Sequence, residues 1–197
     1  MQSLTEIRIA GFGGQGVILA AAIIGKAAAL FQNGYATMTQ SFGPEARGGA
    51  SSAQLILSES PILYPYVTQP DILVVMSQEA CNRFVPELKD GGILIVEQDL
   101  VRITALKPNT RVFSVPATRL AEELGKRVVL NSVMVGFFTA VTQLLDADAV
   151  ARAVADSVPP SLRDLNLQAF RKGIDYGLSQ PAAGIGGELE DVAYLQD

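Results

Sequence analysis

The residues best suited to chemistry are glycines near the start of the chain. Gly11, Gly13 and Gly16 have the G-x-G-x-x-G spacing and lie between a β-branched run and a long apolar stretch. This spacing is typical of a strand-to-helix turn, where backbone N–H groups and the positive end of a helix dipole face an anion such as a phosphate. We predict that these glycines, with Gly14 and Gln15, form a phosphate-binding turn. A tight turn that binds no ligand has the same spacing and stays open as the alternative.

The sequence after this turn departs from that of nicotinamide-dinucleotide sites. Those sites place an Asp or Glu about 20 residues after the glycines, where it holds the ribose hydroxyls. Here no acidic residue occurs between Gly11 and Glu45. The turn can still bind a phosphate, but a nicotinamide-dependent oxidoreductase becomes the weaker interpretation.

A second candidate anion site lies in the loop predicted at residues 41–49 by their glycine and proline content. Arg47 directly precedes Gly48 and Gly49. A guanidinium can bind a phosphate through two hydrogen bonds, and glycine amides can approach the same anion. We therefore predict that Ser41, Arg47, Gly48 and Gly49 contribute to the ligand site. An exposed turn with an incidental ion pair is the alternative.

Composition narrows the classes of function. The 197 residues suit one domain, and a hydrophobic fraction of 49% with 7% aromatics favours a parallel sheet covered by helices. The net charge of −5 argues against non-specific nucleic-acid binding. The absence of histidine excludes a Ser-His-Asp triad and a histidine-ligated metal, and a single cysteine, Cys81, cannot hold an iron–sulfur cluster or a cysteine zinc site alone. With no secretory signal pattern and no bilayer-length apolar run, we expect a cytoplasmic chain without membrane contact.

Hydrophobic periodicity predicts an α/β fold. The predicted strands are residues 6–11, 35–40, 50–57, 72–76, 93–96 and 112–115. The predicted helices are residues 16–32, a helix capped by Ser77, 119–124 capped by Thr118, 131–145, 148–158 and 167–178. We expect a single domain at residues 1–179, with a Rossmann-like, mostly parallel open sheet and helices on both faces. The acidic segment 180–197 is expected to be a mobile tail.

Three of these helices carry further predictions. The helix at 16–32 is apolar almost all round, so we expect it to be buried by the sheet and by a later helix or another chain. Asn131 and Ser132 begin their helix; each can be a simple cap or can present its side chain to a ligand at the carboxyl edge of the sheet. The last helix is predicted to have an apolar stripe of Leu167, Phe170, Ile174 and Leu178.

The order of these motifs carries a family resemblance. Residues 11–17 and 40–49 resemble the gamma subunit of the 2-oxoacid:ferredoxin oxidoreductases, and further matching segments lie at 70–74, 76–79, 91–92 and 131–134. Together they cover about residues 7–136. The form of residues 43–49 is more similar to 2-oxoglutarate-type than to pyruvate-type subunits.

The resemblance implies a function for the chain as part of a complex. Such a complex oxidatively decarboxylates a 2-oxoacid with coenzyme A, giving acyl-CoA, CO2 and reduced ferredoxin. Thiamine diphosphate and the iron–sulfur clusters belong to the alpha and beta subunits, with or without a delta subunit, and ferredoxin is an indirect partner. The gamma-type domain is associated with coenzyme A binding and active-site closure.

The same resemblance implies roles for particular residues. Gly11, Gly13, Gly14, Gln15, Gly16, Ser41, Arg47, Gly48, Gly49 and Asn131 are the expected coenzyme A contacts. No catalytic residue and no metal ligand is expected in this chain, and the isolated chain is expected to be inactive and able to form a homodimer. A purely structural interface subunit remains the alternative.

Overall fold

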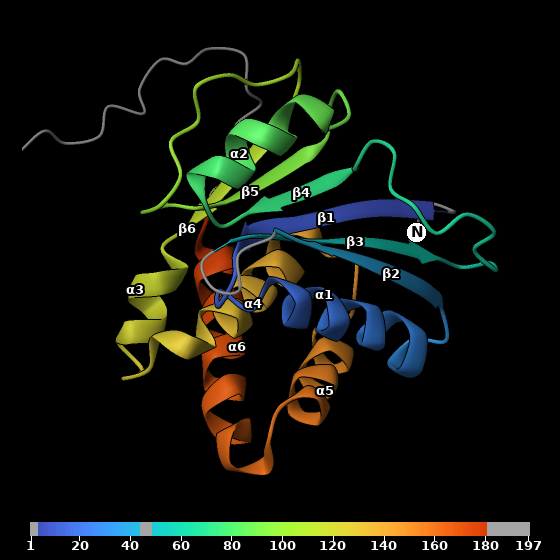
Figure 1. Cartoon of the computed structure of the whole chain (residues 1–197). Coiled ribbons are helices and arrows are strands. Elements are labelled where there is room, and N and C mark those ends of the chain that lie inside the picture. Colours follow the sequence, from blue (N-terminus) through green and yellow to red (C-terminus); the bar gives the residue numbers. More distant parts are fainter. Residues whose placement is uncertain (1–3, 44–48, 181–197) are drawn as a thin grey trace, which may run out of the picture.

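A sheet of six strands, in the order β2-β3-β1-β4-β5-β6, runs through the centre of the fold (Figure 1). This computed structural model describes residues 4–43 and 49–180. Strands β1, β4, β5 and β6 are parallel, whereas β3 is antiparallel to both β1 and β2. The strands are β1 (Leu4–Phe12), β2 (Tyr35–Phe42), β3 (Ala50–Ser58), β4 (Ile72–Val75), β5 (Ile93–Glu97) and β6 (Arg111–Val115).

Two inner strands, β4 and β5, show why the sequence forms this sheet. Every residue of both strands is buried, which matches the apolar runs at residues 72–75 and 93–96 and the cover on both faces of the sheet. The predicted strands are confirmed, each with ends within two residues of the observed ones. The mostly parallel α/β architecture is therefore as the sequence predicted.

Helices cover both faces, but unequally (Figure 1). Helix α2 packs alone against one face, and the other helices pack against the opposite face around the larger part of the core. The helices are α1 (Val17–Lys26), α2 (Gln78–Phe84), α3 (Ala117–Glu122), α4 (Leu130–Thr142), α5 (Ala147–Ser157) and α6 (Arg163–Ser179). Shorter turns are the π-helical η1 (Ala27–Phe31) and the 3₁₀ turns η2 (Val85–Glu87), η3 (Arg127–Val129) and η4 (Pro160–Leu162).

The apolar helix α1 is buried by its own chain. It packs between the sheet and the later helices α4 and α5, so its second apolar side does not need another subunit. The predicted helix at 16–32 is confirmed, with its last turn in the wider π form of η1.

Helices α4 and α6 pack closely because small residues face each other. A Cβ on Gly136 would lie 2.0 Å from the Phe170 carbonyl oxygen, and a Cβ on Gly173 would lie 2.0 Å from the Val133 carbonyl oxygen. The predicted apolar stripe on the last helix is wrong at Leu178, which is 67% exposed. Glycines, rather than a continuous row of large apolar residues, therefore form much of the contact face of α6.

The start of α3 also corrects a prediction. Thr118 lies inside the helix rather than capping it, and its hydroxyl oxygen is buried without a hydrogen-bond partner in the described part of the chain. The buried Glu97 carboxylate accepts from the Thr118 N–H at 3.1 Å and from the Asp99 and Leu100 N–H groups at 2.9 and 2.8 Å. The predicted cap at Ser77 is confirmed, since its side chain accepts from the Ala80 N–H.

No helix within residues 4–43 and 49–180 is long and apolar enough to cross a membrane. The expected mobile tail lies outside the described residues from position 181 onward. The division into 1–179 and 180–197 stays a prediction.

Candidate ligand-binding site

The glycine-rich segment forms a turn between β1 and α1. Gly14 and Gly16 have φ angles of 96° and 74°, in the left-handed region that side chains with a Cβ rarely adopt. The strand-to-helix geometry that the spacing predicts is therefore present. Its place at the carboxyl end of β1 is where open α/β sheets usually bind ligands.

Part of this turn is used by the chain itself. The Gly13 N–H donates to the Gly49 carbonyl oxygen at 2.8 Å, and the Gln15 N–H donates to the Phe12 carbonyl oxygen at 3.2 Å. By contrast, the N–H groups of Gly14 and Gly16 have no hydrogen-bond acceptor among the described residues. The first-turn N–H groups of α1 also have no acceptor within the helix. The turn therefore offers an anion several backbone donors, but fewer than its glycine count suggests.

The Gln15 side chain holds the turn together. Its Oε1 accepts from the Phe12 N–H at 2.6 Å, and its Nε2 donates to the Met76 carbonyl oxygen at 2.7 Å. These bonds join the carboxyl ends of β1 and β4. Because both ends of the amide are occupied, the geometry gives Gln15 a role in shaping the turn, and its contact with a ligand stays a prediction.

Asn131 faces the same turn from α4. It is 3% exposed, and a Cβ on Gly16 would lie 2.8 Å from the Asn131 Cβ. Its amide has no hydrogen-bond partner in the described ranges. The neighbouring Ser132 is engaged elsewhere, since its hydroxyl donates to Asn166 Oδ1 at 2.7 Å across the α4–α6 contact. Of the two polar residues that the sequence could not separate, Asn131 is the one with an unused polar group.

A hollow of about 230 Å³ lies at the same edge of the sheet, between the strand ends and α2. Gly11 and Ser41 line it, as do Gly43 and Ala50, the residues on either side of the loop that contains Arg47. Arg47 and Gly48 fall outside the described residues, so their predicted role stays untested. The buried Gly49 contributes its carbonyl oxygen to the turn, as described above.

Sequence reasoning missed five polar residues of this hollow, which are Ser51, Ser52, Ser77, Glu79 and Arg83. Ser77 follows β4 after Met76, and Arg83 belongs to α2, where its guanidinium lies 5.0 Å from the Phe84 ring centroid. Ser77 could have been found because residues at the carboxyl ends of parallel strands meet at one edge. Arg83 lies in a helix and carries no comparable signal.

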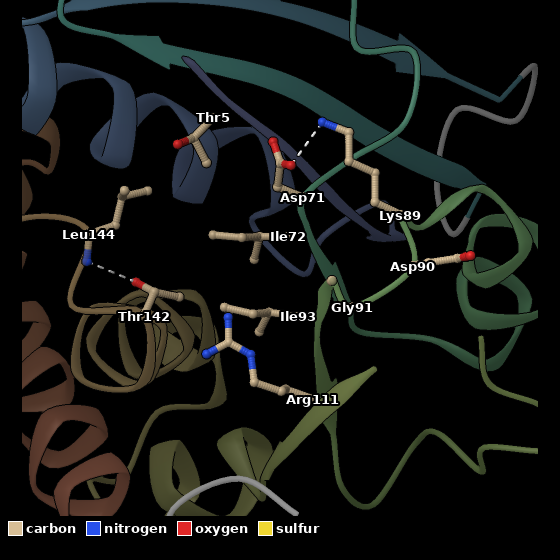
Figure 2. A pocket seen from close by; sticks show the side chains of 11 residues that line it. Thr5, Asp71, Ile72, Lys89, Asp90, Gly91, Ile93, Arg111, Thr142 and Leu144 are labelled. Atoms are coloured by element: carbon tan, nitrogen blue, oxygen red, sulfur yellow. Dashed lines mark hydrogen bonds and ion pairs between the residues drawn. The ribbon is translucent and has the colours of Figure 1, made fainter. Parts of the chain in front are cut away.

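A larger hollow of about 320 Å³ lies at the opposite edge of the sheet (Figure 2). The first residues of β4, β5 and β6 line it, so it is at the amino ends of the parallel strands. Its Lys89 is paired with Asp71 at 2.8 Å, and Arg111 extends into the hollow from the other side. Its larger size does not make it the better candidate. The backbone N–H groups of Gly14 and Gly16 and the Asn131 amide, which lack partners among the described residues, lie at the carboxyl ends of the parallel strands.

Comparison with known proteins agrees with the resemblance. The sequence model of the pyruvate ferredoxin/flavodoxin oxidoreductase family matches residues 6–176. The chain is 49% identical over 174 residues to the 2-oxoglutarate synthase subunit KorC of Methanothermobacter thermautotrophicus. The aligned region covers 85% of this chain and 92% of that protein.

Two solved structures share the fold. The gamma subunit of a keto/oxoacid ferredoxin oxidoreductase from Geobacter sulfurreducens superposes with a TM-score of 0.80 at 36% identity, covering 92% of this chain and 99% of that one. A 2-oxoglutarate:ferredoxin oxidoreductase from Magnetococcus marinus, solved with 2-oxoglutarate, coenzyme A and succinyl-CoA bound, superposes with a TM-score of 0.82 at 20% identity. That match covers 93% of this chain but only 32% of the longer chain, and it shows the fold alone.

Proposed function

Because the chain belongs to the pyruvate ferredoxin/flavodoxin oxidoreductase family, we propose that it is the gamma subunit of a 2-oxoacid:ferredoxin oxidoreductase, of 2-oxoglutarate type. In this role it docks coenzyme A and closes the active site while the 2-oxoacid is oxidatively decarboxylated to acyl-CoA, CO2 and reduced ferredoxin. The similarity to KorC subunits along almost their whole length supports the 2-oxoglutarate type over the pyruvate type.

The observation that carries coenzyme A docking is the set of unused donors at the glycine turn. Coenzyme A supplies a thiol that accepts the acyl group, and it carries a diphosphate and a 3′-phosphate. The free Gly14 and Gly16 N–H groups and the α1 dipole favour one of these phosphates. The buried Asn131 side-chain amide lies against the turn, where its N–H groups can donate to a phosphate. A bidentate contact from Arg47 would complete the site.

Other subunits must supply the redox chemistry. The chain has one cysteine, buried in α2, which does not fit an iron–sulfur cluster, and it has no Gly-Asp-Gly sequence of the thiamine-binding type. We assign thiamine diphosphate and the clusters to alpha and beta subunits, with or without a delta subunit, and ferredoxin contacts those subunits rather than this chain. We place the complex in the cytoplasm.

The test is a titration of the assembled complex with coenzyme A. We expect Arg47→Ala to raise the KM for coenzyme A about tenfold or more, because it removes a charge-assisted phosphate contact. We expect Asn131→Asp to raise the same KM by a similar factor, because it places a negative charge beside the phosphate. The KM for the 2-oxoacid should change little in either variant, since the contact is with the carrier alone.

Lys107→Ala is the matched control for Arg47→Ala. It also removes one positive charge, but Lys107 lies at the other edge of the sheet, where it pairs with Asp90 at 3.7 Å. Its KM for coenzyme A should match that of the unmodified complex. Unchanged coenzyme A kinetics in both site variants would contradict docking at this turn.

A structural interface subunit is the second candidate. It is favoured by the Gly13 N–H, the Gln15 N–H and the Gln15 side-chain amide, which already form hydrogen bonds within the chain. That reading predicts normal coenzyme A kinetics in the Arg47 and Asn131 variants whenever the complex assembles. A measurement on purified, fully assembled complex therefore separates the two functions.

A further inference from the structure

The hollow beside the glycine turn is lined by an arginine that has no acidic partner. Arg83 of α2 forms no hydrogen bond or ion pair with any described residue. The hollow measures about 230 Å³, less than the roughly 300–1,000 Å³ of pockets that enclose a whole small-molecule ligand. It therefore suits one charged end of a larger molecule, with the rest of that molecule outside it.

The Phe84 ring supports this arginine. The ring is buried, and the Cζ atoms of Arg8 and Arg83 lie 4.6 and 5.0 Å from its centroid. The two guanidiniums differ in their charge balance. Arg8, which is buried on β1, is paired with the Glu87 carboxylate. Arg83 has no such carboxylate among the described residues, so its charge and its N–H donors are available to a ligand.

Serine hydroxyls line the same hollow. Ser41 of β2 and Ser52 of β3 are opposed in the sheet, and neither hydroxyl has a hydrogen-bond partner among the described residues. Ser77 Oγ accepts from the Ala80 N–H at 3.2 Å, which leaves its O–H proton to donate. A guanidinium together with hydroxyl donors is a combination that binds phosphate oxygens.

Glu79 limits the kind of phosphate that fits. It is the one acidic residue among the described residues that line the hollow, and it lies in the first turn of α2, one turn before Arg83. No ion pair joins these two side chains. A carboxylate in this position repels a bare phosphate but accepts hydrogen bonds from N–H and O–H groups. The hollow therefore suits a phosphorylated nucleoside, which carries both a phosphate and such donors, better than inorganic phosphate.

Coenzyme A carries its diphosphate and its 3′-phosphate on one adenosine, so the two groups need neighbouring sites. Backbone amides at a helix N-terminus suit a diphosphate, whereas a separate arginine suits a phosphate on the ribose, as in NADP sites. Gly11 belongs both to the glycine turn and to the lining of the hollow, so the two sites are contiguous here. We propose that Arg83 binds the 3′-phosphate of coenzyme A, with the diphosphate at the turn, and that Arg83 thereby selects coenzyme A over carriers that lack this phosphate. The assignment rests on the proposed function and adds to it which phosphate lies where.

The first experiment compares coenzyme A with dephospho-coenzyme A, which lacks only the 3′-phosphate, in steady-state kinetics of the assembled complex. The KM of the unmodified complex should be about tenfold or more higher for dephospho-coenzyme A, because one charge-assisted contact is missing. Arg83→Gln should raise the KM for coenzyme A by a similar factor and leave that for dephospho-coenzyme A unchanged. The preference between the two carriers should therefore disappear in this variant.

Arg111→Gln is the matched control. It makes the same change in side chain and net charge, and Arg111 is likewise exposed, but it lies at the amino ends of the parallel strands. Its KM values for both carriers should match those of the unmodified complex. A second measurement does not depend on turnover of the carrier. Adenosine 3′,5′-bisphosphate should compete with coenzyme A more strongly than AMP does in the unmodified complex, and the two should compete equally in Arg83→Gln.

Three results would overturn the assignment: equal use of both carriers by the unmodified complex, an unchanged KM for coenzyme A in Arg83→Gln, or an equal rise for both carriers in that variant. The last result would show that Arg83 acts on a part that the two carriers share. Failure of this assignment is distinct from failure of the proposed function. If Arg47→Ala and Asn131→Asp raise the KM for both carriers while Arg83→Gln behaves as the unmodified complex, docking at the turn holds and only the role of Arg83 is wrong. Normal kinetics in the Arg47 and Asn131 variants would instead contradict docking at the turn.

Discussion

Asn131 lies directly against Gly16, although the two residues are far apart in the sequence. A Cβ on Gly16 would sit 2.8 Å from the Asn131 Cβ and 2.9 Å from its Nδ2. This contact joins the turn before α1 to the start of α4. The same contact that leaves no room for a side chain at position 16 keeps an unused amide beside the proposed phosphate site.

Gly16→Ala should destabilise the fold more than Gly14→Ala. Both glycines have a left-handed φ, which costs alanine about 1–2 kcal/mol, but only Gly16 also lacks space for the added methyl group. We expect a loss of about 3 kcal/mol for Gly16→Ala, or roughly 6–12 °C in Tm, against about half of that for Gly14→Ala. Thermal unfolding followed by circular dichroism measures both, and equal losses would show that Asn131 does not crowd Gly16.

Gly173→Ala tests the contact between α4 and α6. The added methyl group would lie 2.0 Å from the Val133 carbonyl oxygen, so the helices must move apart, at a cost of about 3 kcal/mol or more. Gly25→Ala is the control within α1, where the nearest atom is the flexible Leu55 Cδ1 at 3.1 Å. There the gain in helix propensity, about 1 kcal/mol, should offset most of the crowding. Urea unfolding of both variants gives the comparison, and a mild effect at Gly173 would contradict backbone contact.

The strands could be predicted because their sequences carry strong local signals. The runs at residues 72–75 and 93–96 are apolar, bounded by turns and buried as predicted. The turn at Gly14 and Gly16 was also predictable, because few residues other than glycine adopt its backbone angles. In each case the physical cause lies within a few residues of the pattern.

The parts that could not be predicted depend on contacts distant in the sequence. In the sequence, Gly173 only indicates a residue of low helix propensity. Its role is evident only in the structure, where the Val133 backbone packs against it. Leu178 fits the helical period of its neighbours, but the helix turns it toward solvent. The pairing of Ser132 with Asn166, which leaves Asn131 as the free amide, likewise depends on where α6 packs.

Thr118→Val should leave stability unchanged or raise it by about 1 kcal/mol. The Thr118 hydroxyl oxygen is buried without a hydrogen-bond partner among the described residues, so replacing it with a methyl group removes a desolvation cost. Thr139→Val is the matched control, because the Thr139 hydroxyl donates to the Val135 carbonyl oxygen at 2.8 Å in an equally buried helix. That variant should not gain stability. Urea unfolding of the two variants decides the matter, and a clear loss for Thr118→Val would reveal a partner for its hydroxyl.

Cys81 should make stability fall at high pH. Burial in α2 raises the pKa of the Cys81 thiol, so over a window above the ordinary thiol range the unfolded chain ionises while the folded chain keeps its proton. The stabilisation is therefore complete below the pKa of the unfolded thiol and is lost as the pH rises through that of the folded one. Between about pH 7.5 and about pH 9.5, the free energy of unfolding measured with urea should decline less in Cys81→Ala than in the unmodified chain.

Alkylation by iodoacetamide should also be at least about tenfold slower in the folded than in the urea-unfolded chain, since the reactive species is the thiolate. Equal declines in both chains, or equally fast alkylation, would mean that the thiol reaches water in the folded state.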